Sequence, residues 1–169
     1  MRLFIAVNPD EGIKDELSFI QKRLKLQGVG GRYTTRENMH LTLAFIGEYG
    51  DPYAVSEVLS HIPFERARLV LDGFGCFGDT YWIGVKKDPG LEANVRRIRK
   101  ALADNGIPFD KKRFMPHITI ARKIEYSKGI PTDSPFPAGM DVEYVSLMRS
   151  DRGKSGMIYT VVDEFCKIK

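Results

Sequence analysis

Apolar positions in the first part of the chain follow two periods, one typical of strands and one typical of helices. The run RLFIAV at residues 2–7 is almost wholly apolar and stops at a polar Asn-Pro pair, as a short buried strand does. Four apolar residues then recur at helical spacing before Gly28: Ile13, Leu17, Ile20 and Leu24. We therefore predict a strand followed by a helix that ends near Gly28.

The same periods predict the other elements of the chain. Alternation predicts strands at HLTLAFIG (residues 40–47), RLVLDGFGCF (68–77), YWIGV (81–85), HITIAR (117–122), VEYVSLMRS (142–150) and MIYTVVDEF (157–165). Helical spacing predicts one helix from Asp51 to Ile62 and another through Leu91, Val95, Ile98 and Leu102, closed by Asn105-Gly106. The segment 127–139 is rich in Pro and Gly, which indicates a surface loop.

Size and charge restrict the class of protein. The 169 residues are 43% hydrophobic, which is enough for one domain with a sizeable core, and no apolar run is long enough to span a membrane. Lys and Arg outnumber Asp and Glu by 26 to 22, a balance that permits an anionic ligand without requiring one. Cys76 and Cys166 are isolated, and the chain opens without a secretory segment, so we expect reduced thiols and a cytoplasmic protein.

Two of the three histidines lie in nearly the same pentapeptide. His40 begins His-Leu-Thr-Leu-Ala, and His117, 77 residues later, begins His-Ile-Thr-Ile-Ala. Because side chains alternate along a strand, each histidine shares one face with the threonine two residues on, Thr42 or Thr119, and then with a small alanine. The repetition suggests two similar lobes of one α+β domain over residues 1–169, with the two strands facing each other.

Facing imidazoles and hydroxyls suit acid-base chemistry on a phosphate. One neutral histidine can take a proton from a nucleophile while a protonated one gives a proton to the leaving group. Threonine hydroxyls can hold the non-bridging phosphate oxygens. A metal site is disfavoured, because zinc requires three or four converging ligands and threonine is a poor one. His61 lacks the pattern and is interpreted as a helix-end or surface residue, and Cys76 and Cys166 as small core residues.

The two His-x-Thr-x motifs, His40-Leu-Thr-Leu and His117-Ile-Thr-Ile, resemble those of the two-histidine (2H) phosphoesterases. The stretches ENMHLTLAFIGE, FGCFGDTYWIGV, FMPHITIARK and VSLMRSDRGKSGMIYTVVDEF are similar, in that order, to segments of the LigT-like RNA 2′,3′-cyclic phosphodiesterases, also called 2′-5′ RNA ligases. The resemblance covers nearly the whole chain. It implies a bilobal α+β fold in which two pseudo-symmetric lobes with antiparallel sheets line a central cleft and the helices lie outside.

The resemblance also implies roles for individual residues. His40 would give a proton to the departing 3′ oxygen and His117 would activate water, leaving a 2′-phosphate end, while Thr42 and Thr119 would hold the phosphate. Arg122 would contact the phosphate only if a bend or bulge turned it toward the cleft, since a regular strand would point it away. No cofactor and no metal are implied. The partner would be RNA with a 2′,3′-cyclic phosphate end, and we expect a monomer with no membrane contact.

Other features leave alternatives open. Phe77, Tyr81 and Trp82 could stack on a base, although core packing is the more common role of such residues. The basic runs at residues 96–100 and 111–113 are interpreted as a solvated helix face and a loop, with steering of RNA as the alternative. Besides hydrolysis and the reverse 2′-5′ ligation, the chain could be an RNA-binding module without turnover. It could also be a phosphodiesterase for a small cyclic nucleotide or an oligoadenylate.

Overall fold

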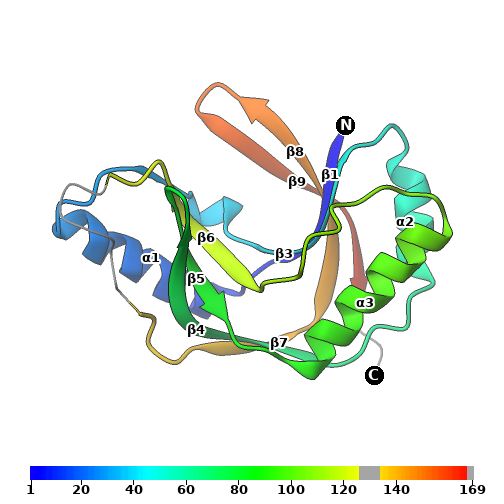
Figure 1. Ribbon diagram of the computed structural model, residues 1–169, viewed down its shortest axis with the longest axis horizontal. Helices are drawn as coiled ribbons and strands as arrows, with labels where there is room; N and C mark the ends of the chain where they lie inside the picture. The colour runs from blue at the N-terminus through cyan, green and yellow to red at the C-terminus, as the bar shows by residue number, and fades with distance from the viewer. Residues whose placement is uncertain (126–133, 167–169) are drawn as a thin grey trace.

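The computed structural model describes residues 1–125 and 134–166, which form two antiparallel sheets and the helices packed beside them (Figure 1). The predicted loop at 127–139 therefore lies partly outside the described residues. The elements follow in the order β1 (Arg2–Val7), α1 (Glu11–Leu26), β2 (Arg32–Tyr33), the 3-10 turn η1 (Arg36–Asn38), β3 (Leu41–Glu48), α2 (Pro52–Ser60), β4 (Ala67–Phe77), β5 (Thr80–Val85), α3 (Pro89–Asp104), β6 (His117–Arg122), β7 (Gly139–Val142), β8 (Tyr144–Gly153) and β9 (Gly156–Cys166).

The predicted strands and helices are confirmed, and two short strands were missed. The first sheet has the order β3-β1-β8-β9 and the second has the order β2-β6-β5-β4-β7. The missed strands β2 and β7 form the two edges of the second sheet and hold two and four residues, too few to show an alternation. The predicted strand at 142–150 also crosses a break, because β7 ends at Val142 and β8 starts at Tyr144.

Each α-helix in the described part of the chain is preceded by an aspartate that caps it. Asp10, Asp51 and Asp88 each accept a hydrogen bond from the backbone N–H three residues later, which satisfies one of the free donors of the first turn. Helix α1 lies against the second sheet, where it contacts β6 and β7, whereas α2 and α3 pack on each other, with α2 against β9 of the first sheet and α3 against both β3 and β4 (Figure 1). The helices thus cover the outside of the sheets, as expected.

The core is built from the apolar residues that set the helix and strand periods. Helix α1 buries Ile13, Leu17, Ile20 and Leu24, and α3 buries Leu91, Val95, Ile98 and Leu102. In β3 and β6 the residue after each histidine, Leu41 or Ile118, is fully buried in the same cluster. The core therefore fixes the two strands that start at the histidine motifs, and it leaves the other face of each strand free.

The two sheets do not correspond to the two halves of the sequence. Strand β1 pairs with β3 on one side and with the late strand β8 on the other, so the first sheet combines both ends of the chain. Strand β2 in turn crosses to pair with β6 in the second sheet. The local pattern around the motifs is nevertheless the same in both sheets: β3 pairs with β1, and β6 pairs with β5, each antiparallel.

Candidate active site

The two histidines are held in the same way at the starts of their strands. The Nδ1 of His40 lies 2.7 Å from the carbonyl oxygen of Asn38, and the Nδ1 of His117 lies 2.6 Å from that of Met115, in each case two residues earlier. A carbonyl can only accept, so Nδ1 carries the proton and donates it. This arrangement leaves Nε2 as the ring nitrogen available for proton transfer in both residues.

Aromatic side chains form the walls around each imidazole. Phe4 and Tyr159 lie 4.9 and 5.1 Å from the His40 ring, the tyrosine edge-on, while Phe77 and Trp82 lie 5.2 and 5.5 Å from the His117 ring, the phenylalanine edge-on. These contacts restrict rotation of the rings. Tyr81 is fully buried, so it packs in the core and does not stack on a base. Phe77 is 45% exposed at the edge of the site, so its ring is accessible to a base.

A β-bulge follows each motif at the same position. In β3, Thr42 pairs with Ala6 of β1 and Ala44 pairs with the adjacent Ile5, so Leu43 is bypassed. In β6, Trp82 pairs with Thr119 and the next partner is Ala121, so Ile120 is bypassed. Each bypassed residue is the third after its histidine.

The bulges change which side chains face the site. A regular strand would place the fifth residue after the histidine on the face opposite to the threonine, but one extra residue reverses this. Thr119 and Arg122 consequently line the same hollow, and on the other strand Thr42 and Phe45 do so too. The bulge therefore turns Arg122 toward the cleft, which is the condition that the sequence prediction set for it.

A buried glutamine from α1 supports the bulge in β6. The Nε2 of Gln21 donates to the carbonyl oxygen of the bypassed Ile120 at 2.9 Å and to that of Thr34 at 2.8 Å. The backbone N–H of Thr34 also donates to the Ile120 carbonyl at 3.0 Å. The irregular backbone is thus tied to a helix whose own position is set by the core.

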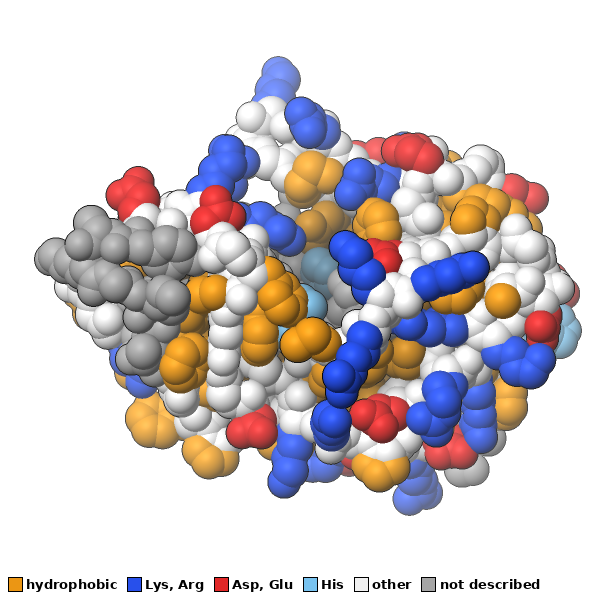
Figure 2. Space-filling model, viewed as in Figure 1, with side chains coloured by type: hydrophobic (Ala, Val, Ile, Leu, Met, Phe, Trp, Pro, Cys, Tyr) orange, Lys and Arg blue, Asp and Glu red, His pale blue; other side chains and the backbone are white. Residues whose placement is uncertain are grey.

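The motifs meet in a cleft made of adjoining hollows (Figure 2). The hollow beside His117 has a volume of about 560 Å³ and shares Thr42 and Phe45 with a second hollow of about 360 Å³, which contains His40. A third hollow contains Thr119 and shares His40 and Arg122 with the second. Figure 2 shows histidine side chains at the floor of this depression, with Lys and Arg side chains around its opening.

The surroundings of His40 favour its neutral form in the free cleft. Burial lowers the pKa of the His40 imidazole, and the positive charges of Arg122 and His117 lower it further. The hydrogen bond to Asn38 opposes this shift. The same interactions show that the two motifs lie close together, since Arg122 and His117 act on His40 from the other sheet.

Several residues of the cleft were not identified from the sequence. Tyr159 and Arg152 come from the β8–β9 hairpin, and Arg2 comes from β1, where its guanidinium lies 4.9 Å from the centre of the Phe45 ring. No motif in the sequence marks them. Phe45 could have been identified from the sequence, because it is the fifth residue after His40, as Arg122 is the fifth residue after His117.

The basic runs divide between the cleft and the surface. Arg99, Lys112 and Arg113 line the hollow beside His117. Arg97 and Lys100 instead form ion pairs on the surface, with Glu65 and Asp104 respectively. The exposure of residues 111–113 agrees with the interpretation as a solvated loop, while their place beside the cleft is compatible with the alternative of RNA steering.

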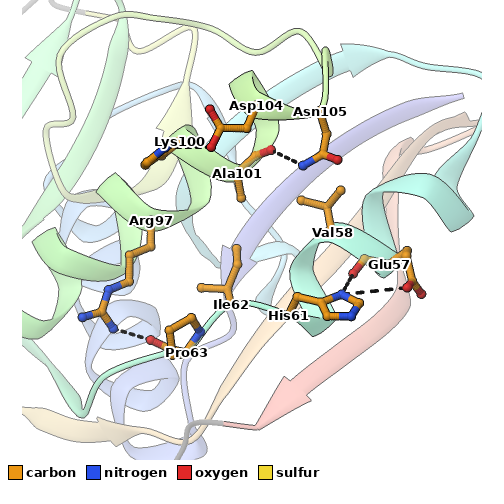
Figure 3. Close-up of a pocket in the computed structure, with 10 residues that line it drawn as sticks. All are labelled: Glu57, Val58, His61, Ile62, Pro63, Arg97, Lys100, Ala101, Asp104 and Asn105. Carbon is orange, nitrogen blue, oxygen red and sulfur yellow. Dashed lines mark hydrogen bonds and ion pairs between the residues drawn. The ribbon is translucent and has the colours of Figure 1, made fainter.

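His61 lies away from the cleft, in a separate groove of about 580 Å³ between α2 and α3 (Figure 3). It caps the end of α2, and its exposed ring contacts the Glu57 carbonyl oxygen at 2.8 Å. Its position agrees with the helix-end prediction. Of the two cysteines, both free, Cys76 packs against the core, but Cys166 at the end of β9 is exposed, so its prediction as a core residue was wrong.

The described residues form neither a metal centre nor a membrane-spanning helix. Within residues 1–125 and 134–166, no three His, Cys, Asp or Glu side chains are grouped so that they could hold a metal ion. In the same part of the chain, no helix combines the length and the apolar character needed to cross a membrane.

Comparison with known sequences places the chain in a family. The sequence profile described as "LigT like Phosphoesterase" matches residues 7–86 and again residues 83–159, so each match contains one histidine motif. The chain belongs to the LigT-like phosphoesterase family. Among these phosphoesterases, the chain is 33% identical to the RNA 2′,3′-cyclic phosphodiesterase of Thermotoga maritima, with 97% of this chain and 94% of that protein covered. It is 36% identical to the protein of the same name from Aeropyrum pernix, with 81% and 86% covered.

Solved structures of LigT-like phosphoesterases have the same fold. The crystal structure of Escherichia coli LigT complexed with 3′-AMP matches with a TM-score of 0.86 and 26% identity, covering 99% of this chain and 98% of that one. The E. coli LigT structure complexed with ATP matches with a TM-score of 0.84 and 25% identity. The expected bilobal LigT-like fold is therefore confirmed.

Proposed function

We propose that the chain opens the 2′,3′-cyclic phosphate at the end of an RNA and leaves a 2′-phosphate. The observation that carries the proposal is the matched pair of imidazoles, each donating through Nδ1 to a carbonyl and each sharing a hollow of one cleft with a threonine. The relatives named RNA 2′,3′-cyclic phosphodiesterase support the reaction and the RNA substrate.

In the proposed reaction, water attacks phosphorus on the side opposite O3′. His117 takes a proton from the water through Nε2 while the new P–O bond forms. The P–O3′ bond breaks, and His40 gives the proton on its Nε2 to O3′, so that the products are a 2′-phosphate and a 3′-hydroxyl. Proton transfer by two positioned groups on opposite sides of phosphorus needs no further reactant.

The negative charge of the substrate favours the protonated form of His40 that the reaction requires. Without a ligand, burial lowers the pKa of His40, whereas a proton donor must be protonated. A phosphodiester anion beside the ring acts in the opposite direction and raises the pKa of His40. In this proposal, substrate binding and protonation of His40 support each other.

Thr42, Thr119 and Arg122 are the proposed phosphate ligands. The two hydroxyls can donate to the non-bridging oxygens, and the guanidinium adds a charge-assisted hydrogen bond. Support comes from their placement, because Thr42 and Thr119 each share a hollow with both His40 and Arg122.

The same residues would also catalyse ligation, in which a 5′-hydroxyl takes the place of water. If the 5′-hydroxyl of a second RNA replaces water, the imidazoles join the two ends through a 2′-5′ bond. We also propose that residues 1–169 act as one domain, as a monomer and in the cytoplasm. The shared first sheet, in which β1 pairs with both β3 and β8, supports a single domain.

The test is incubation of the purified protein with an RNA that ends in a 2′,3′-cyclic phosphate, after dialysis against EDTA. We expect hydrolysis with a bell-shaped pH profile and a product that keeps its phosphate on the 2′-hydroxyl. Binding without turnover would identify an RNA-binding module, and turnover of small cyclic nucleotides or oligoadenylate alone would identify another substrate. Activity that disappears with EDTA and returns with added zinc or manganese would refute the two-histidine mechanism.

A further inference from the structure

The β8–β9 hairpin extends beyond the sheet to which it belongs. Strand β1 pairs with β8 only as far as Ser150, whereas the pairing between β8 and β9 continues to Gly153 and Gly156. We call residues 151–158, which lie beyond this point, the arm. Figure 1 shows the hairpin projecting away from the rest of the molecule.

The arm contributes little to the core. Of its two large apolar residues, Met157 is 37% exposed and Ile158 is 54% exposed. A two-stranded ribbon without a packed face is at best marginally stable in water. The arm is therefore poorly explained by folding alone, and a binding role accounts for its length.

One side of the arm forms a wall of the catalytic cleft. Arg152 and Met157 line the hollow that contains His40, and Met157 also lines the hollow that contains Thr119. Asn38 joins the arm to the catalytic centre, because its Nδ2 donates to the Met157 carbonyl oxygen at 2.8 Å while its own carbonyl accepts from His40. Asn38 thus fixes the position of the arm, and of a ligand bound to it, relative to His40.

Charge distinguishes the opening beside the arm from the opening beside His117. Among the described residues, the hollows on the arm side are lined by four arginines and by no carboxylate: Arg2, Arg32, Arg122 and Arg152. The hollow beside His117 contains three cations together with Asp110, and one of those cations, Arg99, donates to the Lys112 carbonyl oxygen at 2.8 Å. The arm side is therefore the more favourable path for a polyanion.

The end of the arm extends this positive surface. Lys154 is exposed in the turn, two residues past Arg152, and neither residue takes part in an ion pair within the part of the chain that the structure describes. Asp151, the acidic residue of the arm, is paired with Arg149 at 2.9 Å. At a strand rise of about 3.4 Å per residue, the two-residue step from Arg152 to Lys154 spans at most about 7 Å.

We propose that the arm binds the single-stranded RNA immediately 5′ of the reacting nucleotide, with Arg152 and Lys154 on successive phosphates. This proposal rests on the proposed function and adds a site for the body of the RNA. The protein should then distinguish an RNA end from a mononucleotide, because only the former reaches the arm.

The experiment compares two substrates, adenosine 2′,3′-cyclic phosphate and a short single-stranded RNA with a 2′,3′-cyclic phosphate end. The measured quantity is the ratio of kcat/KM for the RNA to kcat/KM for the mononucleotide. We expect R152A/K154A to lower this ratio roughly tenfold and to reduce the salt dependence of log KM for the RNA by about 1.4, from a slope of about 0.7 per phosphate contact of a single strand. Circular dichroism checks that the variant is folded.

The matched control is K112A/R113A, which removes two cations from the opposite opening. We expect the ratio to stay within about twofold of that of the wild type in this variant. A ratio that falls in K112A/R113A and not in R152A/K154A would overturn the proposal, because the RNA would then leave by the other opening. A ratio that changes in neither variant would overturn it too. Failure of the wild type to open either substrate would instead contradict the proposed function.

Discussion

Replacement of Gln21 tests how a helix outside the cleft controls the shape of strand β6. Its side-chain amide donates to two backbone carbonyls, of Thr34 at 2.8 Å and of Ile120 at 2.9 Å, and the residue is only 7% exposed. Both neighbours of the amide are acceptors, so the orientation of the NH₂ group is fixed. Gln21→Leu keeps an apolar stem of similar length and removes both donors.

The structure sets the size of the effect. Ile120 keeps a second donor, the Thr34 N–H at 3.0 Å, so the main loss falls on the Thr34 carbonyl. One buried polar group left without its partner costs about 1–3 kcal/mol in the free energy of unfolding. For a chain of this size, a loss of about 2 kcal/mol lowers Tm by roughly 4–8 °C.

The assays are thermal and urea unfolding together with hydrolysis of the cyclic phosphate. Because Ile120 is the bypassed residue of the β6 bulge, we expect Gln21→Leu to lower kcat/KM as well, through displacement of Arg122. The control is Lys22→Leu, an exposed neighbour on the same helix that should change stability by less than about 0.5 kcal/mol. Equal stability of the two variants would refute the role of the amide.

Gln21→Glu gives a second, pH-dependent check. A carboxylate facing two carbonyls is disfavoured, so its pKa is raised in the folded state above the unfolded value of about 4.3. The folded state then binds more protons, and the destabilisation grows as the pH rises above that value and shrinks toward acid. A pH-independent difference from the wild type would contradict this reasoning.

Further predictions concern the motif residues. His40→Ala and His117→Ala should each lower kcat roughly 100- to 10,000-fold while the protein stays folded, and near-normal turnover in either variant would exclude its proposed role. Thr42→Val and Thr119→Val should cost roughly 10- to 100-fold in kcat/KM, since a hydrogen bond to a charged group contributes about 1.5–3 kcal/mol; a loss as large as that of the histidine variants would argue against simple phosphate binding. Because the pKa of His40 is lowered in the folded state, its contribution to stability is complete above the unfolded pKa of about 6.5 and is lost as the pH falls toward the folded value. The free energy of unfolding in urea should therefore fall less for His40→Gln than for the wild type between about pH 7 and 5. Parallel plots of this free energy against pH would refute the lowered pKa of His40.

The sequence predicted most elements and the central residues of the site because both depend on local patterns. The strands at His40 and His117 are visible as alternation, and the helices appear through apolar residues such as Leu17 and Ile98 at helical spacing. The repeated pentapeptide identified the two imidazoles without any knowledge of the fold.

The features that the sequence did not indicate depend on long-range pairing. The bulges arise from the register with β1 and β5, and the position of Arg122 could be stated only as a condition on such a bulge. Tyr159 reaches His40 because β9 joins the sheet of β1 through β8, a pairing between the two ends of the chain. Short edge strands such as β2 lack enough residues for a period.

The near equivalence of the two motifs has a consequence for the regiochemistry of the reaction. If the halves of the cleft were identical, a cyclic phosphate could enter in two orientations related by a half-turn, and each would present a different ester oxygen to a given histidine. The equivalent positions after the bulges break this degeneracy, because one holds the cation Arg122 and the other holds Phe45. We expect the phosphate to lie beside Arg122 and a ribose or base to lie beside Phe45. In the proposed reaction, this pair of residues would therefore discriminate between the 2′ and 3′ oxygens, and the histidines, which share the same geometry, need not provide it.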